Sequence, residues 1–439
     1  MKKLVVMAAA VFLSLSSVKA QGSMAIPTGD TAKVKPIRVY GFIRNYFNYD
    51  SRQTYTVVGG EYNMLPYDVL WNEDGTTDLN AVPHAQFQAL TSRIGLEING
   101  PLLLGMKSSG KIEGDFGGFG TNNTVLRLRL AYMKLTYDAD GLYNELLAGQ
   151  AWHPLSGDIM PEVLGMAAGA PFRPHSRTPQ LRITSYLGNV GYTAALLWQL
   201  QYMSNGPRSA ADSASVASLA YANNALLPEL FMGINFRSRA FYVQLGVDEQ
   251  LLRPRTHAVR NGVTSKVNET VVSMTPTLYA QYTEGLWAIR FRTMLAQNTS
   301  HLNQMVGYAV TGIDNDGSWL YDPMRATISY LNVAYGKRVR VNLFLGYMKN
   351  LGAARNLHDF GGGHYLIYMK GGDLFTHLSS AWRVVPSVCY NGKNIGLGLE
   401  YEITAATFGN LAANGSIAND ANLHQVVNHR LCAMAKYTF

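Results

Sequence analysis

Apolar and polar positions alternate with a period of two along most of the chain after residue 86. In the segments 339–347, 395–403 and 431–439, the odd-numbered positions are mainly aliphatic or aromatic, and the even-numbered positions include Arg340 and Glu400. A β-strand points successive side chains to opposite faces, so this pattern predicts strands with one apolar and one wetter face. No helical period of comparable strength competes with it.

About sixteen such segments follow one another as neighbouring hairpins, which predicts an all-β fold. An even number of antiparallel strands closes without an unpaired edge, as a bilayer requires. Many apolar faces end in Tyr, Trp or Phe, the aromatic girdle of membrane barrels. We therefore predict a transmembrane antiparallel β-barrel of about 16 strands. The alternative, a soluble sandwich, explains the alternation of single strands but not this recurrent aromatic ending.

The connections alternate between short and long. Short links such as 138–141 and 283–285 alternate with long ones such as 51–85 and 151–179. Outer-membrane barrels have short periplasmic turns and long outer loops, so both termini are expected on the periplasmic side. We expect the polar connection 51–85 to be a surface loop.

The first 36 residues predict export. A basic start, an apolar run from Leu4 to about Leu15, and Val18-Lys19-Ala20 predict a signal peptide over residues 1–20. The apolar run is too short for a membrane anchor. Residues 21–36 are interpreted as a periplasmic lead-in, and residues 37–439 as a single barrel in the outer membrane of a Gram-negative bacterium.

Composition supports this interpretation. Hydrophobic residues make up 47% of the chain and charged residues only 15%, below the roughly 25% usual for globular proteins. The basic residues form no cluster that predicts nucleic-acid binding. Cys389 and Cys432 are expected two strands apart, beyond disulfide reach, and are predicted to be free thiols.

The inward positions are rich in charge, and arginine outnumbers acid. The predicted pore-lining residues are Arg93, Glu97, Glu113, Asp115, Arg127, Arg129, Arg182, Arg237, Arg290, Arg292, Arg340, Arg383 and Arg430. Charges of both signs facing inward predict a water-filled lumen. Arginine favours anions, which predicts anion preference. The alternative is that internal salt bridges only stiffen the wall of a non-selective pore.

The connection 151–179 is the third outer loop by this count. In sixteen-strand porins that loop folds inward as the constriction, so Trp152, Glu162, Arg173 and Arg177 are the residues expected to line it. The alternative places them on the outer surface.

Five motifs occur in order between residues 86 and 186. They are Thr91-Ser92-Arg93-Ile94-Gly95-Leu96, Lys111-Ile112-Glu113-Gly114-Asp115-Phe116, Arg127-Leu128-Arg129-Leu130-Ala131-Tyr132, Gly149-Gln150-Ala151-Trp152 and Thr178-Pro179-Gln180-Leu181-Arg182. This string resembles the DcaP-like porins. The resemblance implies a homotrimeric outer-membrane channel for small anionic solutes such as dicarboxylates, with Arg93, Arg127, Arg129 and Arg182 in the lumen. The chain departs from the family in lacking an extended helical N-terminal segment and in having His153-Pro154 after the Trp.

The predicted function is therefore a porin for passive diffusion of small hydrophilic solutes. A plugged structural or adhesin-like barrel is the alternative outside transport. An enzyme is not expected, because most histidines fall in predicted loops without a paired Ser or Cys motif. The expected surroundings are outer-membrane lipid and lipopolysaccharide, and Phe439 resembles the terminal residue that the barrel assembly machinery reads.

No cofactor or metal is expected. Residues 314–318 match the opening of a calcium loop but lack its distal Glu, so they predict a plain turn.

Overall fold

The computed structural model describes residues 36–439, except 119–123, 157–159, 166–168, 211 and 261. The predicted signal peptide and nearly all of the predicted lead-in lie outside these residues. Among the described residues, no helix is long and apolar enough to cross a membrane.

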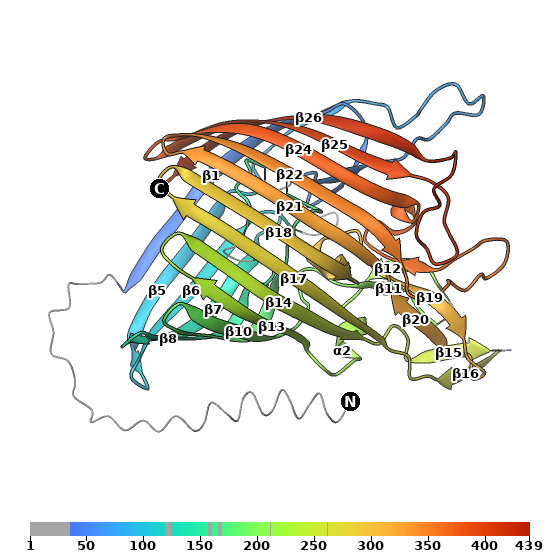
Figure 1. The fold of residues 1–439 in the computed structure, drawn as a ribbon, viewed down its shortest axis with the longest axis horizontal. Helices are drawn as coiled ribbons and strands as arrows, with labels where there is room; N and C mark the ends of the chain where they lie inside the picture. The colour runs from blue at the N-terminus through green and yellow to red at the C-terminus, as the bar shows by residue number, and fades with distance from the viewer. Residues whose placement is uncertain (1–35, 119–123, 157–159, 166–168, 211, 261) are drawn as a thin grey trace. The chain divides into compact units, whose positions relative to one another are not determined.

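The main element is one closed antiparallel sheet (Figure 1). Its strands are β1 (Ile37–Asp50), β4 (His84–Gln88), β5 (Arg93–Leu103), β6 (Met106–Asp115), β7 (Arg127–Ala139), β8 (Leu142–Trp152), β9 (Arg177–Leu187), β10 (Val190–Leu197), β13 (Glu229–Arg237), β14 (Phe241–Leu252), β17 (Val271–Glu284), β18 (Trp287–Gln297), β21 (Arg325–Gly336), β22 (Val339–Gly352), β24 (Leu378–Asn391), β25 (Ile395–Phe408) and β26 (His424–Thr438). Strand β1 pairs with β26 from Phe42↔Thr438 to Asp50↔Arg430, which closes the barrel.

Strands β4 and β5 share one position in the wall. Residues 46–50 of β1 pair with β4, and residues 37–42 of β1 pair with β5. The 17 strands of the sheet therefore fill sixteen positions in the wall. The prediction of an all-β barrel of about 16 antiparallel strands is confirmed.

The two faces of the wall follow the predicted alternation. Val341, Leu343 and Tyr347 of β22 are exposed on the outside, as are Tyr437 and Phe439 at the end of the chain. On the opposite parity, Glu400 and Glu402 of β25 are buried inside the barrel. Cys389 and Cys432 lie on strands separated by β25 and are free thiols, as predicted.

Short turns join the strands at one end, and long loops join them at the other (Figure 1). The loops carry the smaller elements β2 (Thr54–Val57), β3 (Tyr62–Pro66), β11 (Asn205–Pro207), β12 (Ser215–Ala217), α2 (Ala220–Asn223), β15 (His257–Arg260), β16 (Val263–Lys266), η2 (Ser300–Leu302), β19 (Tyr308–Ile313), β20 (Trp319–Pro323), β23 (Ile367–Tyr368) and η3 (Gly372–Phe375). Residues 314–318 form the plain turn that was predicted, in which the Asp314 N–H donates to the Ser318 carbonyl.

The expectation that 51–85 is a surface loop is wrong for its hairpin. Strands β2 and β3 fold into the barrel, and the side chains of Tyr62, Met64 and Leu65 are fully buried. The guanidinium of Arg383 donates to the carbonyl oxygens of Asn63 and Met64, at 3.0 and 2.6 Å. The hairpin folds inward because its apolar side chains join the apolar cluster described below.

Residues 153–176, here called loop 3, reach from β8 to the opposite wall. The amides of Leu164 and Gly165 donate to Glu400 of β25, at 2.7 and 3.2 Å. Leu164 also packs against Gly398, where an added Cβ would lie 2.2 Å from a leucine methyl. Because glycine leaves the wall flat at this point, the loop lies directly on the strand.

Loop side chains pack along the part of the lumen lined by β18, β21, β22, β24, β25, β26 and β1, and the apolar cluster also reaches Ala195 and Leu197 of β10, Phe231 of β13 and Tyr279 of β17. We call this part of the lumen the packed half. Tyr62, Phe172, Leu302, Met305 and Val306 from three loops form one apolar cluster with wall residues. An apolar core of this kind, close-packed and dry, positions the loops relative to the strands.

Candidate functional site

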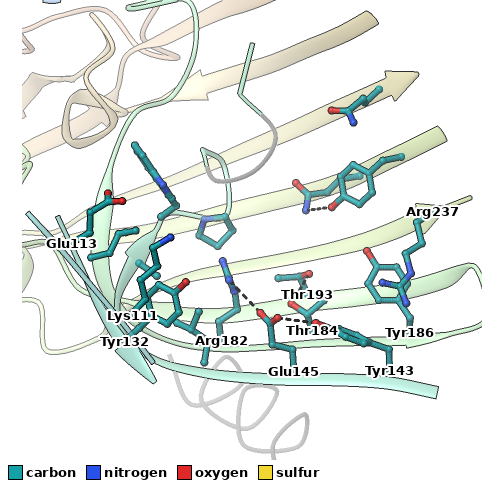
Figure 2. A pocket seen from close by; sticks show the side chains of 18 of the residues that line it. Lys111, Glu113, Tyr132, Tyr143, Glu145, Arg182, Thr184, Tyr186, Thr193 and Arg237 are labelled. Carbon is teal, nitrogen blue, oxygen red and sulfur yellow. Dashed lines mark hydrogen bonds and ion pairs between the residues drawn. The ribbon is translucent and has the colours of Figure 1, made fainter. Parts of the chain in front are cut away.

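A cavity of about 630 Å³ lies on the other side of the lumen, which we call the cavity half (Figure 2). It is lined from β5 round to β17 and by the start of loop 3. The lining residues are Arg93, Lys111, Glu113, Leu130, Tyr132, Tyr143, Glu145, Leu147, Ala151, Trp152, Pro154, Arg182, Thr184, Tyr186, Thr193, Arg237, Tyr242, Gln244 and Gln281. The lining therefore combines four cationic side chains with two carboxylates.

Arg237 is the cation with the fewest partners in this lining. Its guanidinium carbon lies 3.8 Å from the ring centre of Tyr186 and 4.9 Å from that of Tyr143 (Figure 2). In the part of the chain that the structure describes, no carboxylate lies within ion-pair distance of Arg237. The two tyrosine rings hold the guanidinium in place without neutralising it.

Both carboxylates of the cavity are already engaged. Glu145 accepts hydrogen bonds from the Tyr143 hydroxyl at 2.8 Å and from Arg182 at 3.5 Å (Figure 2), and it lies 3.1 Å from the Lys134 ammonium.

Glu113 lies 2.8 Å from Arg129 and 3.4 Å from Arg93. Because each acid faces two cations, the lining as a whole is electropositive.

Several predicted pore-lining residues face inward but are covered. Arg127 donates to both oxygens of Asp115 at 2.9 Å, and Arg129 bridges Glu113 and Asp115. The side chains of Arg127 and Arg129 are only 4% and 1% exposed.

Asp115, Arg292, Arg383 and Arg430 are buried in the same way. The prediction that these six residues face water is wrong. Asp115 is enclosed by the guanidinium groups of Arg127 and Arg129, and carboxylates or loop carbonyls cover the five arginines.

The remaining predicted residues divide between the two halves. Arg93, Glu113, Arg182 and Arg237 line the cavity. Glu97 pairs with Arg38 and Lys111, at 2.5 and 3.3 Å.

Arg290 and Arg340 of the packed half both bind Glu162 of loop 3, each with one nitrogen at 2.8 Å. Burial acts to raise the pKa of Glu162, but the hydrogen bonds from Arg340 and Arg290 hold it below its ordinary value. Loop 3 is thus clamped by a carboxylate that stays ionised.

The other three predicted loop residues have different surroundings. Trp152 lines the cavity, with the Arg177 guanidinium 4.9 Å from its ring centre. Arg177 itself is buried and donates to Gln201 and Tyr202, at 2.9 and 3.1 Å.

Arg173 is also buried and lies 2.8 Å from His175. Burial lowers the pKa of His175 well below its ordinary value, and Arg173 and Arg177 lower it further, so this ring stays neutral. The prediction that Arg173 and Arg177 are exposed at the constriction is wrong. Arg173 lies against His175 inside loop 3, and Arg177, the first residue of β9, is held by Gln201 and Tyr202.

The sequence prediction missed Lys111 and the tyrosines of the cavity. Lys111 shares the parity of Glu113 and Asp115, so alternation alone was sufficient to place it inside. Tyr242 shares the parity of Gln244 and Asp248 and could be placed in the same way. Tyr143 and Tyr186 could not, because tyrosine also belongs to the outer girdle and therefore occupies both faces.

Comparisons with known proteins place the fold among outer-membrane barrels. No family model matches the chain, and no curated protein matches it. Among solved structures, OmpT of Vibrio cholerae, described as outer-membrane expressed, is similar, with 11% identity, coverage of 93% of this chain and 100% of that chain, and a TM-score of 0.50.

The anion-selective porin from Comamonas acidovorans has 12% identity, coverage of 92% and 99%, and a TM-score of 0.49. OmpF of Salmonella typhi, in complex with daunomycin, has 10% identity, coverage of 92% and 97%, and a TM-score of 0.48. At these identities the similarity concerns the fold alone.

Proposed function

We propose that the chain is an outer-membrane porin that admits small hydrophilic solutes by passive diffusion and prefers anions. The fold of a closed transmembrane barrel supports the channel class. In this proposal the solute passes through the cavity half, and the packed half together with loop 3 narrows the lumen.

The observation that carries the anion preference is the charge of the cavity. Arg237 has no carboxylate partner among the described residues, and Glu113 and Glu145 are each held by two cations. A wet lumen weakens each contact to about 1 kcal/mol, so the expected preference is moderate rather than absolute.

The test is single-channel current in planar bilayers under a salt gradient. The mature protein is expected to show an anion-biased reversal potential, and Arg237→Gln is expected to move that potential toward zero. Arg239→Gln is the matched control, because Arg239 lies two residues away in the β13–β14 turn and its side chain is 91% exposed. A cation-biased potential in the wild type, or equal shifts in both variants, contradicts the proposal.

The finer proposal is a preference for dicarboxylates. Guanidinium groups bind carboxylates with two parallel hydrogen bonds, and the cavity offers Arg93, Arg182 and Arg237 on different strands. A solute with two carboxylates can therefore contact two cations at once. Added succinate is expected to block chloride current at lower concentration than acetate does, and equal block by the two anions contradicts this preference.

One observation favours a second candidate, the plugged barrel. Apolar side chains from four loops occupy the packed half, so the loops themselves supply a plug without a separate domain. Absence of conductance in the reconstituted wild type would favour this candidate over the porin.

Assembly as a homotrimer and recognition of Phe439 by the barrel assembly machinery remain predictions. The outward-facing aromatic end of β26 supports the second, since Phe439 is 53% exposed. Current steps in groups of three are the expected sign of the trimer.

A further inference from the structure

Four metal-ligating side chains meet inside the barrel, away from the cavity. They are His153 at the start of loop 3, Glu229 of β13, Asp248 of β14, and His301 of η2 in the loop between β18 and β21. One ligand atom from each residue can be chosen so that all four atoms lie within 4.8 Å of one another. We call these residues the two-histidine cluster.

The cluster is closed to solvent. The side chains are 0%, 3%, 3% and 1% exposed, in the order in which they occur along the chain. The distance from His153 Nε2 to Glu229 Oε1 is 2.7 Å, from His301 Nε2 to Glu229 Oε2 3.2 Å, and from His153 Nε2 to Asp248 Oδ1 3.7 Å. A tetrahedral zinc ion with bonds of about 2.0–2.1 Å requires its ligand atoms to be roughly 3.3 Å apart, which these distances bracket.

The negative charge of the two carboxylates in the cluster is not neutralised by a lysine or arginine. Across the described residues, no lysine or arginine lies within ion-pair distance of Glu229 or Asp248, whose possible cationic partners are the two histidines. Glu229 also accepts a hydrogen bond from the Gln250 amide at 3.5 Å. The buried Oδ1 atom of Asp248 has no hydrogen-bond partner among the residues that the structure describes. Two buried carboxylates in one site are costly unless protons or a metal ion neutralise them, and a divalent cation matches their charge.

We propose that the two-histidine cluster binds a divalent transition-metal ion of the zinc class. Two imidazoles and two carboxylates, without sulfur, form a donor set for zinc. Four protein ligands without an open position indicate a structural site. The ion ties loop 3 and the η2 loop to β13 and β14, and this role does not depend on whether the pore conducts.

The surrounding polar groups indicate how the cluster receives the ion. The Gln250 amide nitrogen lies 3.2 Å from His301 Nδ1, and Asn298 donates to the Gln250 carbonyl at 2.8 Å, which orients the amide beside the ring. The Leu155 amide donates to His153 Nδ1 at 3.1 Å, so the ring carries its proton on Nε2 and faces Glu229 with it. For Nε2 to bind a metal, that proton must be on Nδ1 and the Leu155 amide must turn away. Metal uptake therefore changes the backbone conformation at the first residues of loop 3.

The experiment is metal analysis of the folded, mature protein after treatment with EDTA and dialysis against zinc chloride. The expected result is one zinc ion per chain in the wild type, with at least a tenfold loss of affinity in His153→Gln and in His301→Gln. The matched control is His257→Gln, which changes an exposed loop histidine outside the cluster and is expected to leave the stoichiometry at one. Wild-type stoichiometry below one, or equal affinity in His301→Gln and wild type, overturns the proposal.

Spectroscopy of the wild type keeps the test independent of variant folding. Cobalt substitution is expected to give the strong visible bands of a tetrahedral ion, without the sulfur charge-transfer band that Cys389 or Cys432 would produce. X-ray absorption at the zinc edge is expected to show only nitrogen and oxygen neighbours at about 2.0–2.1 Å. A sulfur neighbour, or the octahedral spectrum of a hydrated surface ion, overturns the proposal.

Discussion

Arg383 in the packed half and Arg237 in the cavity half both stand on inward positions of the wall, yet their surroundings are opposite. Arg383 donates to the Thr404 hydroxyl and to the carbonyls of two loops, and it lies 3.3 Å from Glu402. Arg237 contacts two tyrosine rings and lines a cavity.

The difference teaches that an inward arginine has no fixed role in a barrel. Where a loop brings carbonyl oxygens to it, the guanidinium acts as a structural tie. Where no loop reaches it, the same group remains available to a solute. The loops, together with the carboxylates of neighbouring strands that cover Arg127 and Arg129, therefore decide which inward charges stay unpaired.

The largest loss of stability is expected from Arg383→Met. The substitution leaves Glu402 buried without its cation and leaves the carbonyls of Asn63, Met64 and Ala170 without their donor. Loss of one partner of a buried pair costs about 3–5 kcal/mol, so the urea midpoint of unfolding should fall. The single-channel conductance should rise as the β2–β3 hairpin and loop 3 loosen.

The control for this variant is Arg338→Met, which changes an exposed arginine that contacts Tyr390 beside a short turn. A surface change of this kind is expected to stay within about 0.5 kcal/mol. If both variants have the same urea midpoint, the packed half is not held by its arginine and the comparison between the halves fails.

The second effect is a pH dependence that arises from Glu61, at the turn of the β2–β3 hairpin. Its carboxylate is buried without a hydrogen-bond partner, and burial raises its pKa from 4.5 to about 7, although Arg44 acts to lower it. Below pH 4.5 the group is protonated in both folded and unfolded chains; between pH 4.5 and 7 folding becomes progressively less favourable. Above pH 7 the full cost is about 3 kcal/mol.

Glu61→Gln should therefore raise the unfolding midpoint at pH 8 and leave it almost unchanged at pH 4. Unfolding curves at the two pH values measure this difference. Glu73→Gln, an exposed position in the same long connection, serves as the control. A Glu61→Gln midpoint that follows the wild type at pH 8 would show that the hairpin tip is hydrated rather than packed.

A smaller loss of stability is expected from Gly346→Ala on β22. An added Cβ would lie 2.5 Å from Cγ of the buried Phe172, so loop 3 must move or the ring must leave its site. Overpacking of this kind costs about 1–3 kcal/mol, and the noise of the open channel should increase as the loop loosens. In Gly396→Ala the nearest atom is Cε of the flexible Lys436 at 3.2 Å, so this control should match the wild type.

The smallest effect is expected in the cavity half, from Glu145→Gln. The change removes a carboxylate that Lys134 and Arg182 share, so the cavity becomes more positive and the anion bias of the reversal potential should increase by an amount equivalent to about 1 kcal/mol. Glu284→Gln removes an exposed carboxylate at the β17–β18 turn and should leave the bias unchanged. A decrease in bias for Glu145→Gln would contradict an electropositive cavity.

Alternation predicted the wall because a strand with one face in lipid and one in a charged lumen must keep a strict period of two. The alternation predicted that Leu343 of β22 faces outward and that Glu400 of β25 faces inward. An inward course was predicted for connection 151–179 but not for the β2–β3 hairpin, because the segment Tyr62–Pro66 is buried at every position and shows no alternation of apolar and polar residues.

The burial of Arg127 and the meeting of His153 with His301 depend on contacts between distant segments. Parity places a side chain inside the barrel but does not say whether water or another loop meets it there. For this reason the sequence predicted which side chains point inward. It did not predict which of these charges line the cavity, such as Arg237, and which are buried, such as Arg127.

The pairing of β1 with β26 also sets the order in which this chain can fold. Phe42 of β1 pairs with Thr438 of β26, so closure of the barrel joins residues that lie nearly a whole chain length apart. Until that contact forms, both edges of the sheet present unpaired amides and carbonyls that can join other chains. Closure over so long a separation is slow. The interval between synthesis and closure is thus the stage at which this protein is most exposed to aggregation.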